Sequence, residues 1–416
     1  DQFSSREVSE VLSSGSSTTG TSFTETQPKS DGVWFFHLVA ENGAGLTSAV
    51  ATYTLFIDSS PPAAVSVNDG DAADISFSSS ASRLAANWTE SSDGMSGVQK
   101  YFYSIGSSPG ASDTVAWTDA GTSTSAVETG LSLDGGSTYY FSVKAVNGSG
   151  LFSSAGVSDG VTVDISAPDA VTIVNDGAGD DAQFHADDSF LAGNWTAASD
   201  GESGISAYYI SAGTSPGASD TVQWTHAGTD TSSTAAGLSL SNGQIYYFTV
   251  KALNGAGLFS PPSVSDGVTI DTSPPDAVAF VSDGTGADET YSTNDDSLSA
   301  NWAASSDPQS GVTAYYYSIG SSAGASDTLS WTGAGGATST TETGLALSGG
   351  EKYYFSVKAL SGAGAFSSAT VSDGITVDVS APAPVASVTD GGETDIDYST
   401  DFSRLSAAWA ETSDAE

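Results

Sequence analysis

The sequence predicts an all-β protein built as a tandem array of β-sandwich domains with about seven short strands each. Apolar and polar residues alternate in many segments, as in Tyr139–Ala145, which is the period of a half-buried strand. Asp-Gly, Asn-Gly and Gly-Gly pairs separate these segments and mark tight turns. The same pattern then returns along the chain, so we expect one kind of domain several times over.

Aromatic landmarks fix the length of the repeat, because they recur at a step of 107 residues. The three series are Trp88, Trp195, Trp302 and Trp409; Trp117, Trp224 and Trp331; and Tyr139, Tyr246 and Tyr353. A period of this size matches an independent domain and is too long for one unit of a solenoid. We therefore expect separate domains, each with a buried tryptophan such as Trp88 in its core.

Three segments of the repeat resemble a fibronectin type III domain. Leu84–Trp88 resembles strand B with its core tryptophan, and Tyr101–Ile105 resembles strand C. Leu131–Asn147 resembles the E–F corner and strand F, with Tyr139 at the position where a buried hydroxyl bonds to the backbone. The resemblance implies seven-stranded fibronectin type III-like sandwiches, as in bacterial and archaeal cell-surface arrays. In the first unit Trp34 takes the corner position, so the hydroxyl bond is not expected there.

The repeat predicts where each domain begins and ends. We expect a partial domain without its N-terminal strands at 1–60, complete repeats at 61–166, 167–273 and 274–380, and a partial repeat with strands A and B only at 381–416. Short linkers join them at Asp58–Pro62, Asp164–Pro168, Asp271–Pro275 and Asp378–Pro382. Proline favours extended backbone in these linkers, which predicts semi-rigid joints.

The partial units have two interpretations. The first is that the sequence is a window from a longer array, whose neighbouring domains supply the missing strands. The second is that residues 381–416 of one copy complete the first unit of another copy and so build a head-to-tail filament.

Composition limits the possible functions. The chain has 50 acidic and 9 basic residues and a net charge of −41, so it should repel nucleic acids and anionic membranes. It has no cysteine, and no apolar run of about 18 residues that could cross a bilayer. Sequence motifs of hydrolases, phosphate loops and EF-hands are absent, and the three histidines, His37, His185 and His226, fall at unrelated repeat positions. We therefore expect a protein that is not an enzyme.

Acidic residues that recur at the repeat step are the candidate metal ligands. In a sandwich array, Asp69, Asp74 and Asp164 at one pole would face Asp200 at the pole of the next repeat. Such oxygen ligands suit Ca²⁺, the only cofactor that the sequence suggests. The alternative is that these residues form Asp-Gly turns and caps in water. The full candidate set is Asp69, Asp74, Asp164, Asp200, Asp176, Asp181, Asp271 and Asp307.

Aromatic residues suggest a second kind of site. Strand alternation sends Tyr101 and Tyr103 inward and Phe102 outward, and it sends Tyr140 outward from the neighbouring strand. The resulting band could bind a partner chain or a glycan, or it could be ordinary cross-strand pairing that stabilises the sheet. Its members are Phe102, Trp117, Tyr140, Tyr209, Trp224, Tyr247, Tyr316, Trp331 and Tyr354.

These observations predict a structural rod or adhesive filament region of an extracellular cell-surface protein. Its expected partners are other copies of itself or neighbouring domains of a longer chain, and a surface glycan. Two alternatives remain open. One is a calcium-dependent module that binds a glycan or a protein. The other is a spacer array within a larger secreted enzyme.

Overall fold

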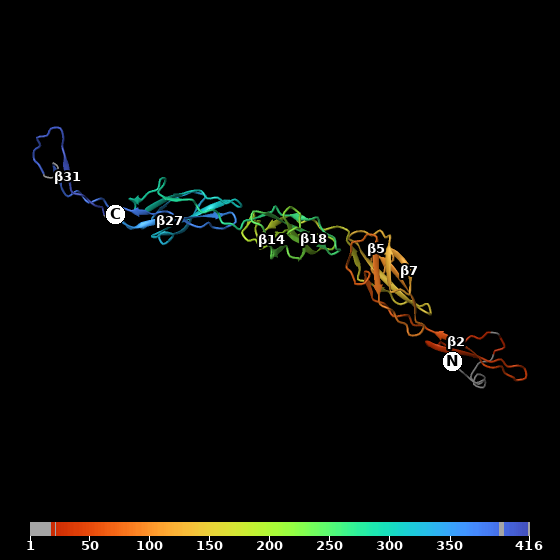
Figure 1. Cartoon of the computed structure of the whole chain (residues 1–416). Helices are drawn as coiled ribbons and strands as arrows, with labels where there is room; N and C mark the ends of the chain where they lie inside the picture. The colour runs from red at the N-terminus through yellow and green to blue at the C-terminus, as the bar shows by residue number, and fades with distance from the viewer. Residues whose placement is uncertain (1–17, 21, 391–394, 415–416) are drawn as a thin grey trace. The chain divides into compact units, whose positions relative to one another are not determined.

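The computed structural model describes residues 18–20, 22–390 and 395–414, and all of its regular elements are strands (Figure 1). These residues form no helix, and so none that could cross a membrane. The prediction of an all-β protein is confirmed.

The chain divides into two compact units. One unit runs up to Val171 and adds Ala197–Tyr208 and Lys251–Pro261. The other consists of Thr172–Thr196, Tyr209–Val250 and the residues from Pro262 onward. The first unit contains all strands of the first complete repeat, and the second unit contains all strands of the third.

The first complete repeat is a sandwich of two sheets. The smaller sheet has the order β3-β5-β8 and the larger has the order β4-β11-β9-β6-β7, with β10 also paired to β9. The pairs are antiparallel, except that β4 runs parallel to β11. The strands are β3 (Val67–Asp69), β4 (Phe77–Ser78), β5 (Arg83–Trp88), β6 (Val98–Gly106), β7 (Val115–Gly121), β8 (Ser125–Thr129), β9 (Thr138–Asn147), β10 (Gly156–Val157) and β11 (Val161–Val163).

The core of this repeat lies between the two sheets. Trp88 from β5 is only 5% exposed, and its ring centroid lies 6.0 Å from that of Tyr101 on β6. Phe141 and Val143 from β9 are fully buried in the same cluster. Because the side chains of β9 alternate between its two faces, these residues share the face that is turned to the core. The predicted burial of the repeating tryptophans is confirmed, since Trp195 and Trp302 are buried as well.

The third complete repeat has the same strand order around its own core of Trp302, Tyr315 and Phe355. Its strands are β21 (Val281–Asp283), β22 (Tyr291–Ser292), β23 (Ser297–Trp302), β24 (Val312–Gly320), β25 (Leu329–Gly335), β26 (Ser339–Thr343), β27 (Lys352–Ser361), β28 (Thr370–Val371) and β29 (Ile375–Val377).

The second complete repeat contributes residues to both compact units. Its sheet of β12, β14 and β17 lies in the second unit, whereas β15 and β18 each contribute to both. The strands are β12 (Val174–Asp176), β13 (Phe184–His185), β14 (Phe190–Trp195), β15 (Ile205–Gly213), β16 (Val222–Gly228), β17 (Ser232–Ala236), β18 (Ile245–Asn254), β19 (Ser263–Val264) and β20 (Val268–Ile270).

Near the ends of the described chain the sheets are small. Two strands pair near the N-terminal end, β1 (Gly32–Leu38) with β2 (Ala51–Ile57), and two near the C-terminal end, β30 (Val388–Asp390) with β31 (Ala407–Trp409). Trp409 stands at the same repeat position as Trp88 but is 66% exposed.

The tyrosine corner forms in each complete repeat. The backbone N–H of Asp134 donates a hydrogen bond of 3.1 Å to the Tyr139 hydroxyl, and Tyr246 and Tyr353 accept equivalent bonds of 3.0 Å. Trp34 has no hydroxyl, but its indole Nε1 donates a 2.9 Å bond to the carbonyl of Ser30. In the first unit the aromatic side chain therefore donates a hydrogen bond to the backbone, whereas the corner tyrosines accept one. The sequence did not predict this bond.

Candidate functional site

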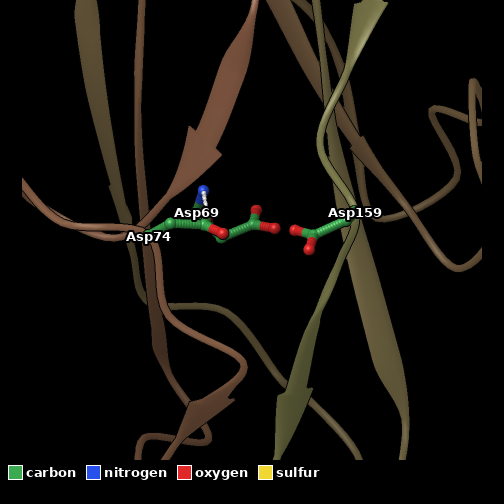
Figure 2. A group of neighbouring side chains, drawn as sticks. All are labelled: Asp69, Asp74 and Asp159. Carbon is green, nitrogen blue, oxygen red and sulfur yellow. Dashed lines mark hydrogen bonds between the residues drawn. The ribbon is translucent and has the colours of Figure 1, made fainter.

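The first complete repeat gathers three carboxylates at one edge of the sandwich. Asp69 ends β3, Asp74 lies in the loop that follows, and Asp159 lies between β10 and β11. One carboxylate oxygen from each lies within 4.8 Å of those of the other two. Figure 2 shows the carboxylate of Asp69 directed across the gap toward that of Asp159.

Backbone hydrogen bonds hold this group in place. The N–H of Asp69 donates to Oδ1 of Asp74 over 2.9 Å, which closes the loop between them. The N–H of Gly160 donates to Oδ2 of Asp69 over 3.0 Å. Asp69 therefore ties the loop after β3 to the loop before β11.

Asp69 is fully buried, whereas Asp74 and Asp159 are exposed. Burial raises the pKa of the Asp69 carboxyl to about 6, and the negative charges of Asp74 and Asp159 add to the rise. Its Oδ1 atom is buried and has no hydrogen-bond partner. A buried carboxylate oxygen without a donor is costly, so this atom marks a place where a proton or a cation would be stabilised.

The same arrangement occurs in the other two complete repeats. Their carboxylate groups are Asp176, Asp181 and Asp266, and Asp283, Asp288 and Asp373. Burial raises the pKa of both Asp176 and Asp283 to about 6. The grouping of Asp69 with Asp74 lies within the expected set, but Asp159 was not among the candidates. Its recurrence at the repeat step, as Asp266 and Asp373, is the sequence signal that could have identified it.

Asp164 and Asp200 belong to a different group, together with Glu202. The sequence predicts that Asp69, Asp74 and Asp164 together face Asp200. In the structure Asp164 lies with Asp200, whereas Asp69 and Asp74 form a separate group with Asp159. Asp164 directly follows β11, the last strand of the first complete repeat, and it is fully buried. Asp200 lies in the loop between β14 and β15.

Asp164 is hydrogen-bonded to residues of the following repeat. Its Oδ2 accepts bonds from the Ser203 hydroxyl and, over 2.8 Å, from Nδ2 of Asn254. The same Nδ2 also donates to Oδ2 of Asp200 over 3.1 Å. Asn254 thus bridges the linker carboxylate and the loop carboxylate, and the linker aspartate has the donors that a buried charge requires.

The preceding joint has the same construction. Asp58 accepts bonds from the Ser96 hydroxyl and, over 3.0 Å, from Nδ2 of Asn147, which also donates to Asp93 over 3.1 Å. The Asn147 amide lowers the pKa of Asp93 below its usual value.

The joint at Asp271 differs at one position. The Ser310 hydroxyl donates to Asp271 as expected, but Ser361 stands where the other joints have asparagine. Oδ2 of Asp307 is buried there without a hydrogen-bond partner.

The aromatic candidates on β6, β7 and their equivalents are partly covered by lysine side chains. Nζ of Lys144 lies 4.4 Å from the ring centroid of Trp117, and Nζ of Lys358 lies 4.3 Å from that of Trp331. Phe102 and Trp117 are half-buried, while Trp331 is 37% exposed. These rings pack against cations on the same sheet, an arrangement that also stabilises the sheet itself.

Three tyrosines of the aromatic band, Tyr140, Tyr247 and Tyr354, have another setting. A Cβ atom on Gly160 would lie 2.5 Å from the ring of Tyr140, and φ at this glycine is +104°. The ring therefore packs directly on a glycine turn. Tyr247 lies in the same way against Gly267, and Tyr354 against Gly374.

The three histidines make unrelated contacts. Nδ1 of His37 lies 2.8 Å from the Thr52 hydroxyl, and Nδ1 of His185 lies 2.7 Å from the carbonyl of Asp187. The ring of His226 meets Tyr209 edge-on at 5.3 Å. No common arrangement connects the three, in keeping with their different positions in the repeat.

The chain is similar to several solved structures. They include the FN1–FN3 domains of chicken CNTN1 (17% identity, 76% of this chain and 97% of that chain, TM-score 0.33). Fibronectin(III)-like modules of Clostridium thermocellum CbhA match with 13% identity over 50% of this chain and 94% of theirs (TM-score 0.33). Domains A168–A170 from titin match with 14% identity over 76% of this chain and 99% of theirs (TM-score 0.32).

No protein-family model and no curated protein matches the sequence. With TM-scores this low, the class of protein rests on the sheets described above. The smaller sheet of three strands, the larger sheet around β9 and β6, and the tyrosine corner define it. The chain is a tandem array of fibronectin type III-like β-sandwich repeats.

Proposed function

We propose that the chain is a structural spacer region of an extracellular cell-surface protein and has no enzymatic activity. The observation that supports this proposal most directly is the linker aspartate. Asp164 is buried, and its carboxylate accepts hydrogen bonds from Ser203 and Asn254 of the next repeat. A spacer needs a defined distance between its domains, and this joint restrains that distance.

The physical argument depends on the strength of these bonds. Hydrogen bonds to a carboxylate are roughly twice as strong as those between neutral groups. A flexible tether would have a solvated linker with few contacts. Here the residue after the last strand is held by the next repeat, and the proline that follows at Pro168 restricts the backbone further. The joints at Asp58 and Asp271 have the same bonded aspartate and serine.

The surface charge suits a solvated spacer within this proposal. A net charge of −41 keeps an array soluble and resists nonspecific association with anionic partners. The partners proposed for a spacer of this kind are neighbouring domains of a longer chain or other copies of the chain.

Paired spin labels would test the joint. The chain contains no cysteine, so cysteines introduced at the exposed Ser125 and Ser232 can be labelled without removing native thiols. We expect a narrow distance distribution that broadens in Asp164→Ala. The control is Asp187→Ala, which removes an exposed carboxylate away from the linker. A distribution in the unaltered chain that is already as broad as in Asp164→Ala would contradict a restrained joint.

A second candidate function is adhesion through the lysine and aromatic face of the larger sheet. The observation that favours it is the placement of lysines, which are scarce in this chain, over aromatic rings on that face. Nζ of Lys358 lies 4.3 Å from the ring of Trp331 and 4.0 Å from that of Phe366. Such a face would suit an acidic glycan, which offers a carboxylate to lysine and a sugar ring to tryptophan. Binding of an acidic polysaccharide that is lost in Trp331→Ala and kept in Tyr291→Ala would support adhesion.

A further inference from the structure

In the first and third complete repeats, the three-carboxylate group has one feature that turn formation does not explain. Asp69 needs only Oδ2 to anchor the loop before β11, since Gly160 donates to that atom. Oδ1 remains buried and without a partner, and it belongs to a carboxylate that faces Asp159 (Figure 2). In the third complete repeat, Oδ1 of Asp283 is likewise buried and without a partner.

We propose that each complete repeat binds one Ca²⁺ through Asp69, Asp74 and Asp159 or their equivalents. The ion would join the loop after β3 to the loop before β11 within a single repeat. This site differs from the joint around Asp164, whose carboxylate already accepts hydrogen bonds from Ser203 and Asn254.

The geometry suits this ion. Ca²⁺ binds oxygen at about 2.3–2.6 Å, so two oxygens on the same ion lie at most about 5 Å apart. The carboxylate oxygens of each group lie within 4.8 Å of one another. Because Asp74 and Asp159 are exposed, water can complete the 6–8 oxygen ligands that Ca²⁺ takes. Mg²⁺ requires a more regular octahedron, and we expect it to bind more weakly.

Charge balance points the same way. Three carboxylates within this distance repel one another. Among the described residues, the ion pairs within complete repeats join Arg83 to Asp71 and Lys100 to Asp119, so they involve other carboxylates. A divalent cation would neutralise most of the charge of the group. It would also give Oδ1 of Asp69 the partner that the protein does not supply.

Calorimetric titration of the chain with CaCl₂ in 0.15 M NaCl, after removal of divalent cations, would test the proposal. We expect three ions per chain, one for each complete repeat, and at least tenfold weaker binding of MgCl₂. Asp159→Asn should reduce the number of ions to two. The triple variant Asp159→Asn, Asp266→Asn, Asp373→Asn should bind none at these sites. The matched control is Asp113→Asn, Asp220→Asn, Asp327→Asn, which removes the same charge from exposed positions and should still bind three ions.

Terbium luminescence gives a second readout that does not depend on stability. The ring of Tyr140 covers Gly160, the residue after Asp159, and can therefore sensitise Tb³⁺ bound at this group. We expect a signal in the unaltered chain that Ca²⁺ displaces and that the first triple variant lacks. Equal binding by the two triple variants would overturn the proposal. Binding that disappears with 0.15 M NaCl, or that is lost only when Asp200 is replaced, would overturn it as well.

Discussion

Nδ2 of Asn254 lies 2.8 Å from Oδ2 of Asp164 and joins the residue that follows one repeat's final strand to the end of a long strand in the next. Asn147 makes the same bond to Asp58 in the preceding joint. In the third joint the equivalent residue is Ser361, whose shorter side chain leaves Oδ2 of Asp307 buried without a partner. The chain therefore contains a natural comparison between complete and incomplete versions of one hydrogen-bond network.

The first prediction exchanges these residues. Asn254→Ser should destabilise the second repeat by about 1–3 kcal/mol, because Oδ2 of Asp200 loses its donor and Oδ2 of the buried Asp164 keeps only the Ser203 hydroxyl. Ser361→Asn should stabilise the third repeat, by about 1 kcal/mol, since the amide can reach both Asp271 and Asp307. Calorimetric unfolding would measure both changes. Asn68→Ser, on an exposed edge, serves as the control, and a stabilisation by Ser361→Asn no greater than that of the control would contradict the proposed role of the amide.

The second prediction concerns a hydrogen-bonded tyrosine and glutamate that are both replaced by apolar residues in the second repeat. The Tyr103 hydroxyl donates to the Glu128 carboxylate, and Tyr317 does the same to Glu342. The second repeat has Ile210 and Ala235 at these two positions.

We therefore expect Tyr103→Ile and Glu128→Ala to be coupled by about 1 kcal/mol or more in a double-mutant cycle. Tyr103→Ile alone leaves the carboxylate without its donor, whereas the double variant reproduces the apolar pair of the second repeat. Chemical denaturation of the four proteins gives the coupling. A sum of single effects equal to the effect of the double variant would show that the two positions act independently.

The repeat, the all-β fold and the core tryptophans could be predicted from sequence, because strand alternation and a fixed period are properties of the chain in one dimension. Burial of Trp88 follows from its place in an alternating strand, and the bond of Tyr139 follows from a family resemblance. The bond of Trp34 could not be predicted in this way. It needs the indole N–H to reach the Ser30 carbonyl, which depends on the path of the local backbone.

The candidate site was predicted only in part for a similar reason. Asp69 and Asp74 are close in sequence, and their grouping is local. Asp159 is far away in the chain and joins them only because the parallel pairing of β4 with β11 brings the two loops to one edge. Strand pairing partners are not visible in the period of the repeat. Asp69 is buried whereas Asp74 is exposed, and this difference also depends on packing between the sheets.

The third prediction concerns the core. Trp88→Ala should destabilise the first complete repeat by about 3–5 kcal/mol, because it removes a large buried side chain and leaves a cavity beside Tyr101 and Phe141. Calorimetry should show one transition shifted down while those of the other repeats remain, since domains of an array can fold independently. The equivalent change at the exposed Trp409 is the internal control, and a loss below about 1 kcal/mol for Trp88→Ala would contradict its place in the core.

The last prediction follows from the buried carboxyl of Asp69, whose pKa is about 6 in the folded repeat, against about 3.9 in an unfolded chain. Between these two values the folded state binds a proton that the unfolded state does not. This stabilising contribution is therefore complete below about pH 4 and is lost as the pH rises through 6. A difference of about two pKa units corresponds to at most about 3 kcal/mol for each repeat.

Without divalent cations, the unaltered chain should thus gain stability relative to Asp69→Asn, Asp176→Asn, Asp283→Asn as the pH falls from 7 to 4. Denaturation at several pH values with chelator present would measure this difference. Carboxyls with lowered pKa, such as that of Asp113, act in the opposite direction but are common to both proteins and cancel in the comparison. If the difference between the two proteins does not change with pH, the three buried aspartates do not titrate in this range.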